Sequence, residues 1–252
     1  HPSAISLSQR ERVKHAFTLA EVFSSHFAGH RKTAFTLAEV LITLGIIGIV
    51  AALTMPNLIA NYQKKQTVTQ LKKAYSQLAQ ALKLSEVTNG EVQYWNLDAP
   101  SDEFANKYVL PYLKHSKILP VSEVNSNTKY RFLDGTYASA ASGFYGGTAI
   151  EIADGTIITV DSWTPSDNSF RTFYIDINGY KKPNVFGKDM FVFWLRSGAD
   201  LKPYFHQYTR EELLFDTSLL QRCTKDKTSF AGMGCATVIM LDGWEIKDDY
   251  PW

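Results

Sequence analysis

The stretch that decides the fold is "RKTAFTLAEVLITLGIIGIVAALTMPN", Arg31 to Asn57. No charged residue occurs from Val40 to Gln63. Because a helix rises 1.5 Å per residue, this run is long enough to cross a hydrocarbon core of about 30 Å, and we expect a membrane span at 35–56. One carboxylate, Glu39, lies near the start of the span. An acid in a lipid-embedded helix is costly unless it is paired or neutralised, so Glu39 is a candidate functional residue.

The charges on either side of the span predict its orientation. Arg31 and Lys32 lie directly before the apolar run, and the first cations after it are Lys64 and Lys65. When the cations nearest the span are weighted, the positive-inside rule places the N-terminal side in the cytoplasm, so that the large C-terminal part is exported. A signal peptide has a shorter apolar core that ends in a small-x-small cleavage site, whereas this run is followed by a sequence that continues as helix.

Composition leaves room for one sizeable folded domain beyond the span. The chain has 252 residues, of which 45% are hydrophobic and 13% aromatic, and this is ample for a core. The net charge of +1 gives no overall attraction to nucleic acid or to anionic membranes. An electrostatic partner therefore has to be argued from local clusters.

The heptapeptide "AFTLAEV" occurs twice, at residues 16–22 and 34–40. Only the second copy is followed by a run that can span a membrane. Two copies of seven residues do not make a solenoid repeat, and we have no physical account of the first. The chain opens at His1 rather than Met, and we expect residues 1–34 to be a leader that is removed or is artefactual in part.

The quoted stretch resembles the N-terminus of type IV pilin-like proteins, including the pseudopilins of type II secretion systems. In that family a basic leader ends in Gly or Ala, followed by Phe-Thr-Leu, a Glu four residues after the Phe, an apolar helix and a Pro. By position, Ala34 matches the last leader residue, Phe35 the first mature residue, Glu39 the acid and Pro56 the helix-bending proline. Ala34 stands where Gly is commonest, and Ala38 where a larger aliphatic residue is usual.

The resemblance implies cleavage between Ala34 and Phe35 by a prepilin peptidase, followed by methylation of the new amino group. It also implies that Glu39 of one subunit meets this amine on a neighbouring subunit, because an uncompensated acid in lipid favours a partner that brings a cation. The implied partners are other pilin or pseudopilin subunits and an inner-membrane assembly platform. The implied location is a single pass through the bacterial inner membrane, with the head outside the cytoplasm and the filament in the periplasm or at the cell surface.

Three features of the span need a test: the position of Glu39, the role of two glycines and a kink at a proline. Glu39 can instead lie at the interfacial edge of an uncleaved signal anchor. Gly45 and Gly48 either permit close approach of neighbouring helices or reflect the general frequency of Gly in membrane helices. Pro56 removes one backbone hydrogen bond and is expected to kink the helix.

From residue 57 to about 90 the pattern becomes amphipathic, which predicts a helical stalk packed on the head. Asn89-Gly90 is a fitting end to this helix. The apolar stripe is formed by Val68, Leu71, Tyr75, Leu78 and Leu82. Cations lie largely elsewhere, at Lys64, Lys65, Lys72, Lys73 and Lys83. They form either a solvated face or the DNA-binding face of a DNA-uptake pilin, and the absence of interleaved arginines and aromatics favours the former.

Residues 91–252 are expected to form an α+β head. "TAIEIADGTIITVD" has apolar residues on both sides of Asp154-Gly155 and predicts a β-hairpin, and "RTFYIDING" and "MFVFWL" are two further strands. Ser101 is expected to cap a short helix that turns Phe104, Tyr108 and Leu113 inward, and a second helix is expected to end at Gly243. The predicted fold is α+β and pilin-like, with a long N-terminal helix packed on a small antiparallel sheet.

Two further site predictions concern a disulfide and a metal. Cys223 and Cys235 are the only cysteines, and in an exported domain we expect a disulfide between them, with two separately buried thiols as the alternative.

Asp176, Asn178 and Asp189 in "DINGYKKPNVFGKD" offer hard oxygen ligands to Ca²⁺, although the spacing is not that of an EF-hand. Some pseudopilins that resemble this chain bind calcium in a loop. The alternative is a turn that uses Asn178-Gly179 for positive φ angles.

No GxSxG, HExxH, P-loop or GxGxxG motif is present, so the familiar catalytic signatures are missing. We therefore expect a structural filament subunit without catalytic activity or an obligate cofactor. Two other functions remain as alternatives. One is an exported enzyme or ligand-binding domain on a signal anchor, which requires a deep pocket lined by convergent polar groups. The other is a DNA-uptake pilin, although a nucleic-acid partner is not favoured.

Overall fold

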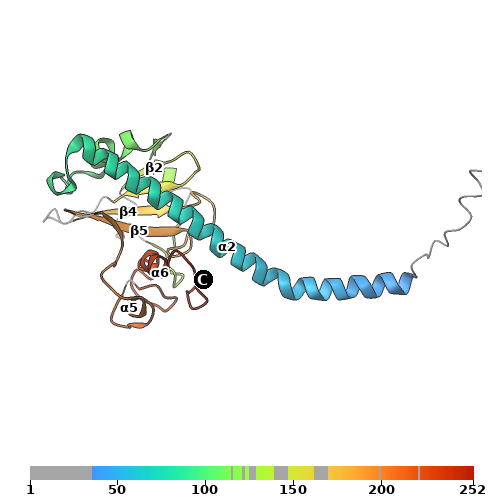
Figure 1. Cartoon of the computed structure of the whole chain (residues 1–252). Helices are drawn as coiled ribbons and strands as arrows, with labels where there is room; N and C mark the ends of the chain where they lie inside the picture. The colour runs from blue at the N-terminus through green and yellow to red at the C-terminus, as the bar shows by residue number, and fades with distance from the viewer. Residues whose placement is uncertain are drawn as a thin grey trace, which may run out of the picture. The chain divides into compact units, whose positions relative to one another are not determined.

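The computed structural model describes residues 36–114, 116–120, 123–124, 129–138, 147–161, 170–198, 200–220 and 222–252. The chain divides into two compact units, residues 1–56 and 57–252. One helix, α2 (Leu37–Asn89), contributes to both units (Figure 1). The expected processing site, Ala34 and Phe35, and the first "AFTLAEV" copy lie outside the described residues.

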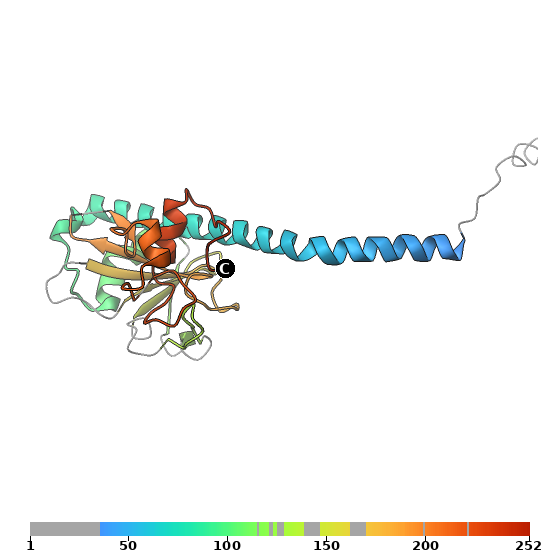
Figure 2. The same ribbon diagram turned by 90° about the horizontal axis from the view of Figure 1, so that it is seen from below.

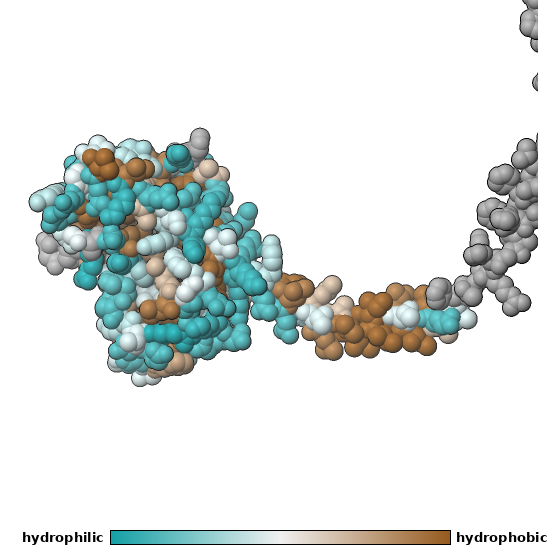
Figure 3. Space-filling view, viewed as in Figure 1, coloured by the Kyte–Doolittle hydropathy of each residue, from teal (hydrophilic) through white to brown (hydrophobic). Residues whose placement is uncertain are grey.

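The part of α2 in the first unit exposes almost all of its apolar side chains. Every residue from Thr36 to Pro56 is exposed except Ala51, which is half-buried, and Figure 3 shows this part as a nearly continuous hydrophobic surface. So much exposed apolar surface is unfavourable in water and requires lipid or other helices to cover it. Among the described residues α2 is the one helix that is long and apolar enough to cross a membrane. Pro56 lies inside it, and a kink there stays a prediction.

The part of α2 in the second unit packs on the head through the predicted stripe. Leu71, Leu78 and Leu82 are buried, and Val68 and Tyr75 are partly buried against the core. The small residues Ala74, Ala81 and Ser85 are buried on the same face, which lets the helix approach the head closely. As predicted, α2 ends at Asn89, and Gly90 follows with a φ of +78°, a conformation that Gly adopts without steric cost.

The described residues of the head contain one six-stranded antiparallel sheet in which every strand pairs with its neighbours in sequence (Figure 2). Its strands are β1 (Lys117–Leu119), β2 (Thr148–Glu151), β3 (Ile157–Val160), β4 (Phe170–Asp176), β5 (Met190–Arg196) and β6 (Leu201–Pro203). The predicted hairpin is confirmed, since β2 and β3 pair with Glu151 opposite Ile157. Gly155 in its turn has a φ of +85°. This α+β, pilin-like architecture is the predicted fold class.

Both faces of the sheet are covered. On one face Tyr75 of α2 packs against Phe193, with ring centroids 5.3 Å apart. On the other, Trp194 packs against Tyr204, with centroids 4.3 Å apart. Figure 1 shows α2 along one side of the sheet, and α5 (Arg210–Phe215) and α6 (Cys235–Leu241) toward the opposite side. Double coverage explains why β5 is buried at nearly every position rather than at alternate ones.

The segment after Ser101 is helical but less regular than expected. It consists of α3 (Ser101–Phe104), the π-helical η2 (Ala105–Val109) and the 3₁₀ segment η3 (Leu110–Tyr112); a further 3₁₀ turn, η1 (Val92–Tyr94), precedes it. The prediction that Ser101 is the cap is wrong, because Pro100 holds that position. The Ser101 hydroxyl instead lies 3.0 Å from that of Thr148, where it ties the helix to β2. Phe104, Tyr108 and Leu113 are buried as predicted.

The C-terminal part of the head is held by a disulfide and a helix end. Cys223 and Cys235 are joined, as expected for an exported domain. Helix α6 stops before Gly243, whose φ is +73°, at the predicted position. Ile246 then returns to the core, and Trp244 is partly buried against it.

Candidate functional site

The first turn of α2 contains a reciprocal hydrogen-bond pair that the sequence analysis did not identify. Oε2 of Glu39 accepts hydrogen bonds from the Thr36 backbone N–H at 2.8 Å and from the Thr36 hydroxyl at 2.9 Å. The Thr36 hydroxyl oxygen accepts one from the Glu39 N–H at 3.2 Å. This is a capping box, and the Thr-x-x-Glu spacing is the signal that predicts it. The acid therefore has partners within its own turn.

These hydrogen bonds do not neutralise Glu39. Both donors are uncharged, and both bonds go to Oε2. The capping box thus fixes the position of the carboxylate while it leaves the negative charge to be compensated. Phe35 directly precedes Thr36, so an amino group freed at Phe35 is one residue from the N–H that the carboxylate already binds.

Two glycines on the exposed helix have no packing role in the described part of a single chain. A Cβ added at Gly45 or at Gly48 would meet no atom within 4 Å. Small residues that face nothing in the monomer suit close contact with a second helix. The observation excludes a packing function within the described part of the subunit, and both sequence interpretations, helix approach and the general frequency of Gly in membrane helices, stay open.

The predicted calcium residues are brought together at the end of β4, where Asp176 lies, and in the loop that follows it. Asn178 Nδ2 donates to Asp189 Oδ2 at 3.2 Å, and the Asn178 N–H donates to Asp176 Oδ1 at 3.1 Å. Asp189 also accepts backbone N–H groups of Asn184 and Val185, both at 2.6 Å. These contacts hold the loop in place from within.

The environment of the two aspartates fits a cation only in part. Burial raises the pKa of Asp176 well above its ordinary value, with a further contribution from the charge of Asp189. Burial also raises the pKa of Asp189. The side-chain amide oxygens (Oδ1) of Asn178 and Asn184 are buried without a hydrogen-bond partner and could serve as ligands. However, the described residues contain no group of three or more His, Cys, Asp or Glu side chains that could hold a metal ion.

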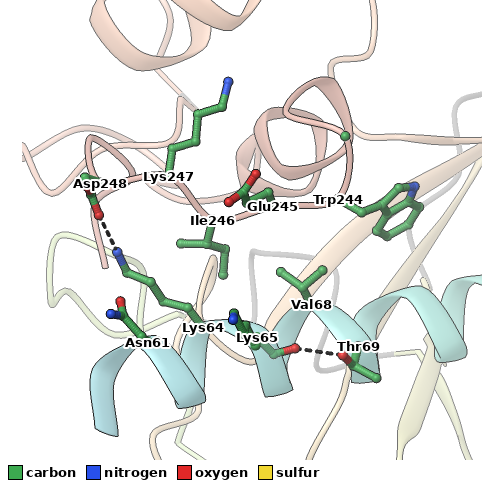
Figure 4. A pocket seen from close by; sticks show the side chains of 11 residues that line it. Asn61, Lys64, Lys65, Val68, Thr69, Trp244, Glu245, Ile246, Lys247 and Asp248 are labelled. Atoms are coloured by element: carbon green, nitrogen blue, oxygen red, sulfur yellow. Dashed lines mark hydrogen bonds and ion pairs between the residues drawn. The ribbon is translucent and has the colours of Figure 1, made fainter. Parts of the chain in front are cut away.

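Two clefts flank α2 at its first turns within the second unit. The first has a volume of about 860 Å³ and lies between residues 61–69 of α2 and the segment 243–248. Figure 4 shows Lys64 reaching across it to Asp248, while Lys247 points away from α2; the Lys64–Asp248 ion pair measures 3.3 Å. Trp244 borders this cleft with a φ of +65°, which is unusual for a bulky residue.

The second cleft has a volume of about 450 Å³ and lies on α2 residues 63–70. Its other wall is formed by the loop between β4 and β5, which contributes Lys181, Lys182 and Lys188, and by Trp252. We call it the lysine cleft. Both clefts begin at the turn of α2 where the charge-free run of the sequence ends.

Two family models match this chain, one in each unit. Residues 29–55 match the prokaryotic N-terminal methylation motif. Residues 57–252, more than half of the chain, match a family of unknown function, DUF6613. The chain belongs to DUF6613. No curated protein and no solved structure matches it.

The N-terminal motif makes this DUF6613 member a type IV pilin-like protein. In general, such a motif implies a membrane-anchored exported precursor that is processed by a prepilin peptidase and assembles with other pilin subunits. The DUF6613 region itself, residues 57–252, carries no assigned function. What the head does has to be argued from its own surfaces.

Proposed function

We propose that this chain is a structural subunit of a type IV pilus or of a type II secretion pseudopilus. In this proposal the precursor is cut between Ala34 and Phe35, and the subunit is held in the bacterial inner membrane with its head outside the cytoplasm. The observation that carries the proposal is the exposed apolar half of α2, which begins at a capped carboxylate. That surface serves in lipid before assembly and in a helix bundle after it.

The capped carboxylate suits a role in assembly. Thr36 holds Oε2 of Glu39 through two uncharged donors, so the negative charge still favours a cation. The freed amine of a neighbouring subunit supplies that cation when a subunit is added. Each addition then relieves the cost of a charge in lipid.

The processing step is tested by intact mass and N-terminal sequencing of the membrane-bound protein from wild-type cells. We expect Phe35 as the first residue, with a mass increment for the methyl group. A strain that lacks the prepilin peptidase is the control and should yield the longer form. A wild-type chain that retains Arg31 and Lys32 would contradict the proposal.

The contacts of the stalk lysines support a structural role over DNA uptake. Lys73 pairs with Asp154 at 2.6 Å, and Lys83 pairs with Asp200 at 2.6 Å. These cations are engaged by carboxylates of the head, which reduces the charge they can offer to phosphates. DNA binding that weakens steeply with salt and is lost when Lys72 and Lys73 are changed to Gln would favour the DNA-uptake function instead.

Calcium binding at Asp176, Asn178 and Asp189 stays a prediction. The ion would neutralise two buried carboxylates and supply a partner for the side-chain amide oxygen of Asn178. Thermal unfolding with and without EGTA tests it, and binding would raise the Tm of the calcium-loaded form. An unchanged Tm would mean that the protein donors alone hold this loop.

A further inference from the structure

The lysine cleft carries cations that form no ion pair within the part of the head that the structure describes. Among the described residues, Lys181, Lys182 and Lys188 form no ion pair with a carboxylate. Two acids line the cleft. Asp154 pairs with Lys73, and Asp189 accepts two backbone N–H groups, which carry no charge. The three lysines therefore face one carboxylate without an ion pair, and the lining has an excess of positive charge.

A fourth cation adds to the crowding. Lys225 donates to the main-chain oxygen of Trp252 at 2.5 Å, and Lys188 lies 5.9 Å from the centroid of the Trp252 ring. Burial and the charge of Lys225 lower the pKa of Lys188, and the charge of Asp189 opposes them. Cations that repel one another around a cavity are stabilised by a bound anion.

The cleft lies close to the apolar segment along the chain. The twenty residues from Leu37 to Pro56 rise about 30 Å, which is the thickness of a hydrocarbon core. Gln63, which lines the cleft, follows Pro56 by only seven residues, and such a connection spans at most about 25 Å. The headgroup layer occupies the first several ångströms beyond the core, and lysine side chains extend into it.

The other cleft residues suit a lipid headgroup. Gln63 and Gln66 offer amide N–H donors from α2, and Trp252 is of the residue type that favours the membrane–water interface. Lysines bind phosphate as flexible point charges, and basic pockets beside a span bind acidic headgroups. A zwitterionic headgroup brings its own cation, which the three lysines of the cleft would repel.

We propose that the lysine cleft binds the phosphate headgroup of an anionic phospholipid in the leaflet on the exported side of the membrane. The inference rests on the proposed membrane anchoring and does not require filament assembly. A bound lipid would fix the head relative to the bilayer surface before the subunit enters a filament.

The test uses the full chain in nanodiscs of phosphatidylcholine alone or with about a third phosphatidylglycerol. We expect phosphatidylglycerol to raise the unfolding temperature of the head, by an amount that shrinks as salt rises because ions screen surface charge. Native mass spectrometry should show phosphatidylglycerol retained on the protein. The triple variant Lys181→Gln, Lys182→Gln, Lys188→Gln should retain the lipid about tenfold less and lose the temperature shift.

A matched variant separates the cleft from general charge. Lys107→Gln, Lys114→Gln, Lys129→Gln removes the same charge from exposed lysines that do not line the cleft, and it should behave as wild type. Equal unfolding temperatures in the two nanodiscs, or equal losses in both variants, would overturn the proposal. So would an equal shift from inorganic phosphate in phosphatidylcholine nanodiscs, which would indicate a site for a soluble anion. Failure of the proposed membrane anchoring can be distinguished from failure of lipid binding, because an unanchored chain would not enter nanodiscs at all.

Discussion

Glu39 caps its own helix, and in the proposed function its charge also serves assembly. Its carboxylate caps the first turn through Thr36, and its charge remains available to a cation. We expect Glu39→Leu to insert into the membrane normally and to be incorporated poorly into filaments, because the partner amine loses its acceptor in lipid. Glu39→Gln keeps the cap without the charge and should show the same defect. Incorporation of both variants at the wild-type level, measured by shear-released filament yield, would contradict the pairing.

Thr36→Val is the matched control for that experiment. It removes the hydroxyl while it keeps the size and the β-branch, so it tests the cap without touching the charge. Loss of an N-cap costs a helix about 1 kcal/mol. We expect a smaller assembly defect than for Glu39→Leu, and an equal defect would assign the role of Glu39 to the cap.

Arg171 is a buried cation whose role lies in stability. Its guanidinium donates to the carbonyls of Asp161, at 2.9 Å, and Ala99, and it lies 4.7 Å from the ring centroid of Phe104. Burial lowers its pKa to about 10, against the opposing charges of Asp161 and Asp98. Arg171→Met should lower the free energy of unfolding by about 3 kcal/mol, because two buried acceptors lose their donor.

Chemical denaturation measures this loss, and Arg196→Met serves as the control. Arg196 is exposed and contacts the ring of Trp194 at 5.4 Å, so its loss should cost less than about 1 kcal/mol. Equal costs for the two variants would mean that the buried hydrogen bonds of Arg171 contribute nothing.

At the scale of elements, the loop between β4 and β5 predicts a pH dependence of stability. Burial raises the pKa of Asp176 in the folded state above its unfolded value, so the folded protein holds a proton that the unfolded chain releases. The resulting stability is complete below the unfolded pKa, about 4, and is lost as the pH rises toward the folded pKa. Asp176→Asn, which stays neutral, should therefore gain stability relative to wild type between pH 4 and pH 8. Urea unfolding between pH 4 and pH 8 measures the free energy of unfolding of both proteins. If the two pH profiles ran parallel, the titration of Asp176 would not contribute to the pH dependence of stability.

Elements with a strong local signal were predictable from the sequence. The apolar run predicted the first half of α2, and the i, i+3, i+4 stripe predicted its buried face. Asp154-Gly155 predicted the hairpin. Each of these patterns depends on residues close together in the chain. The cap of α3 was not predictable, since the Ser101 hydroxyl is engaged by Thr148, which is far away in sequence. The lysine cleft was also missed, because it joins α2, the β4–β5 loop and Trp252 only after folding.

At the scale of the whole molecule, the two units differ in what they bury. The unit of residues 1–56 contains the exposed apolar segment, and residues 57–252 contain the core. The buried residues of α2 begin at Leu71, and no described residue of the first unit is buried. The division predicts that a chain beginning at Asn57 keeps the fold of the head, since it retains every buried contact of α2.

We expect this truncated chain to be a soluble monomer, whereas the full chain requires detergent because its apolar helix is exposed. Size-exclusion chromatography should give a monomer near the mass of residues 57–252, and near-ultraviolet circular dichroism should match that of the head in the full chain. A truncation at Leu71 is the control. It removes Lys64 and its ion pair with Asp248 and uncovers part of Ile246, so it should be less stable. Aggregation of the Asn57 chain, or loss of its aromatic signal, would show that the first unit is needed for the head to fold.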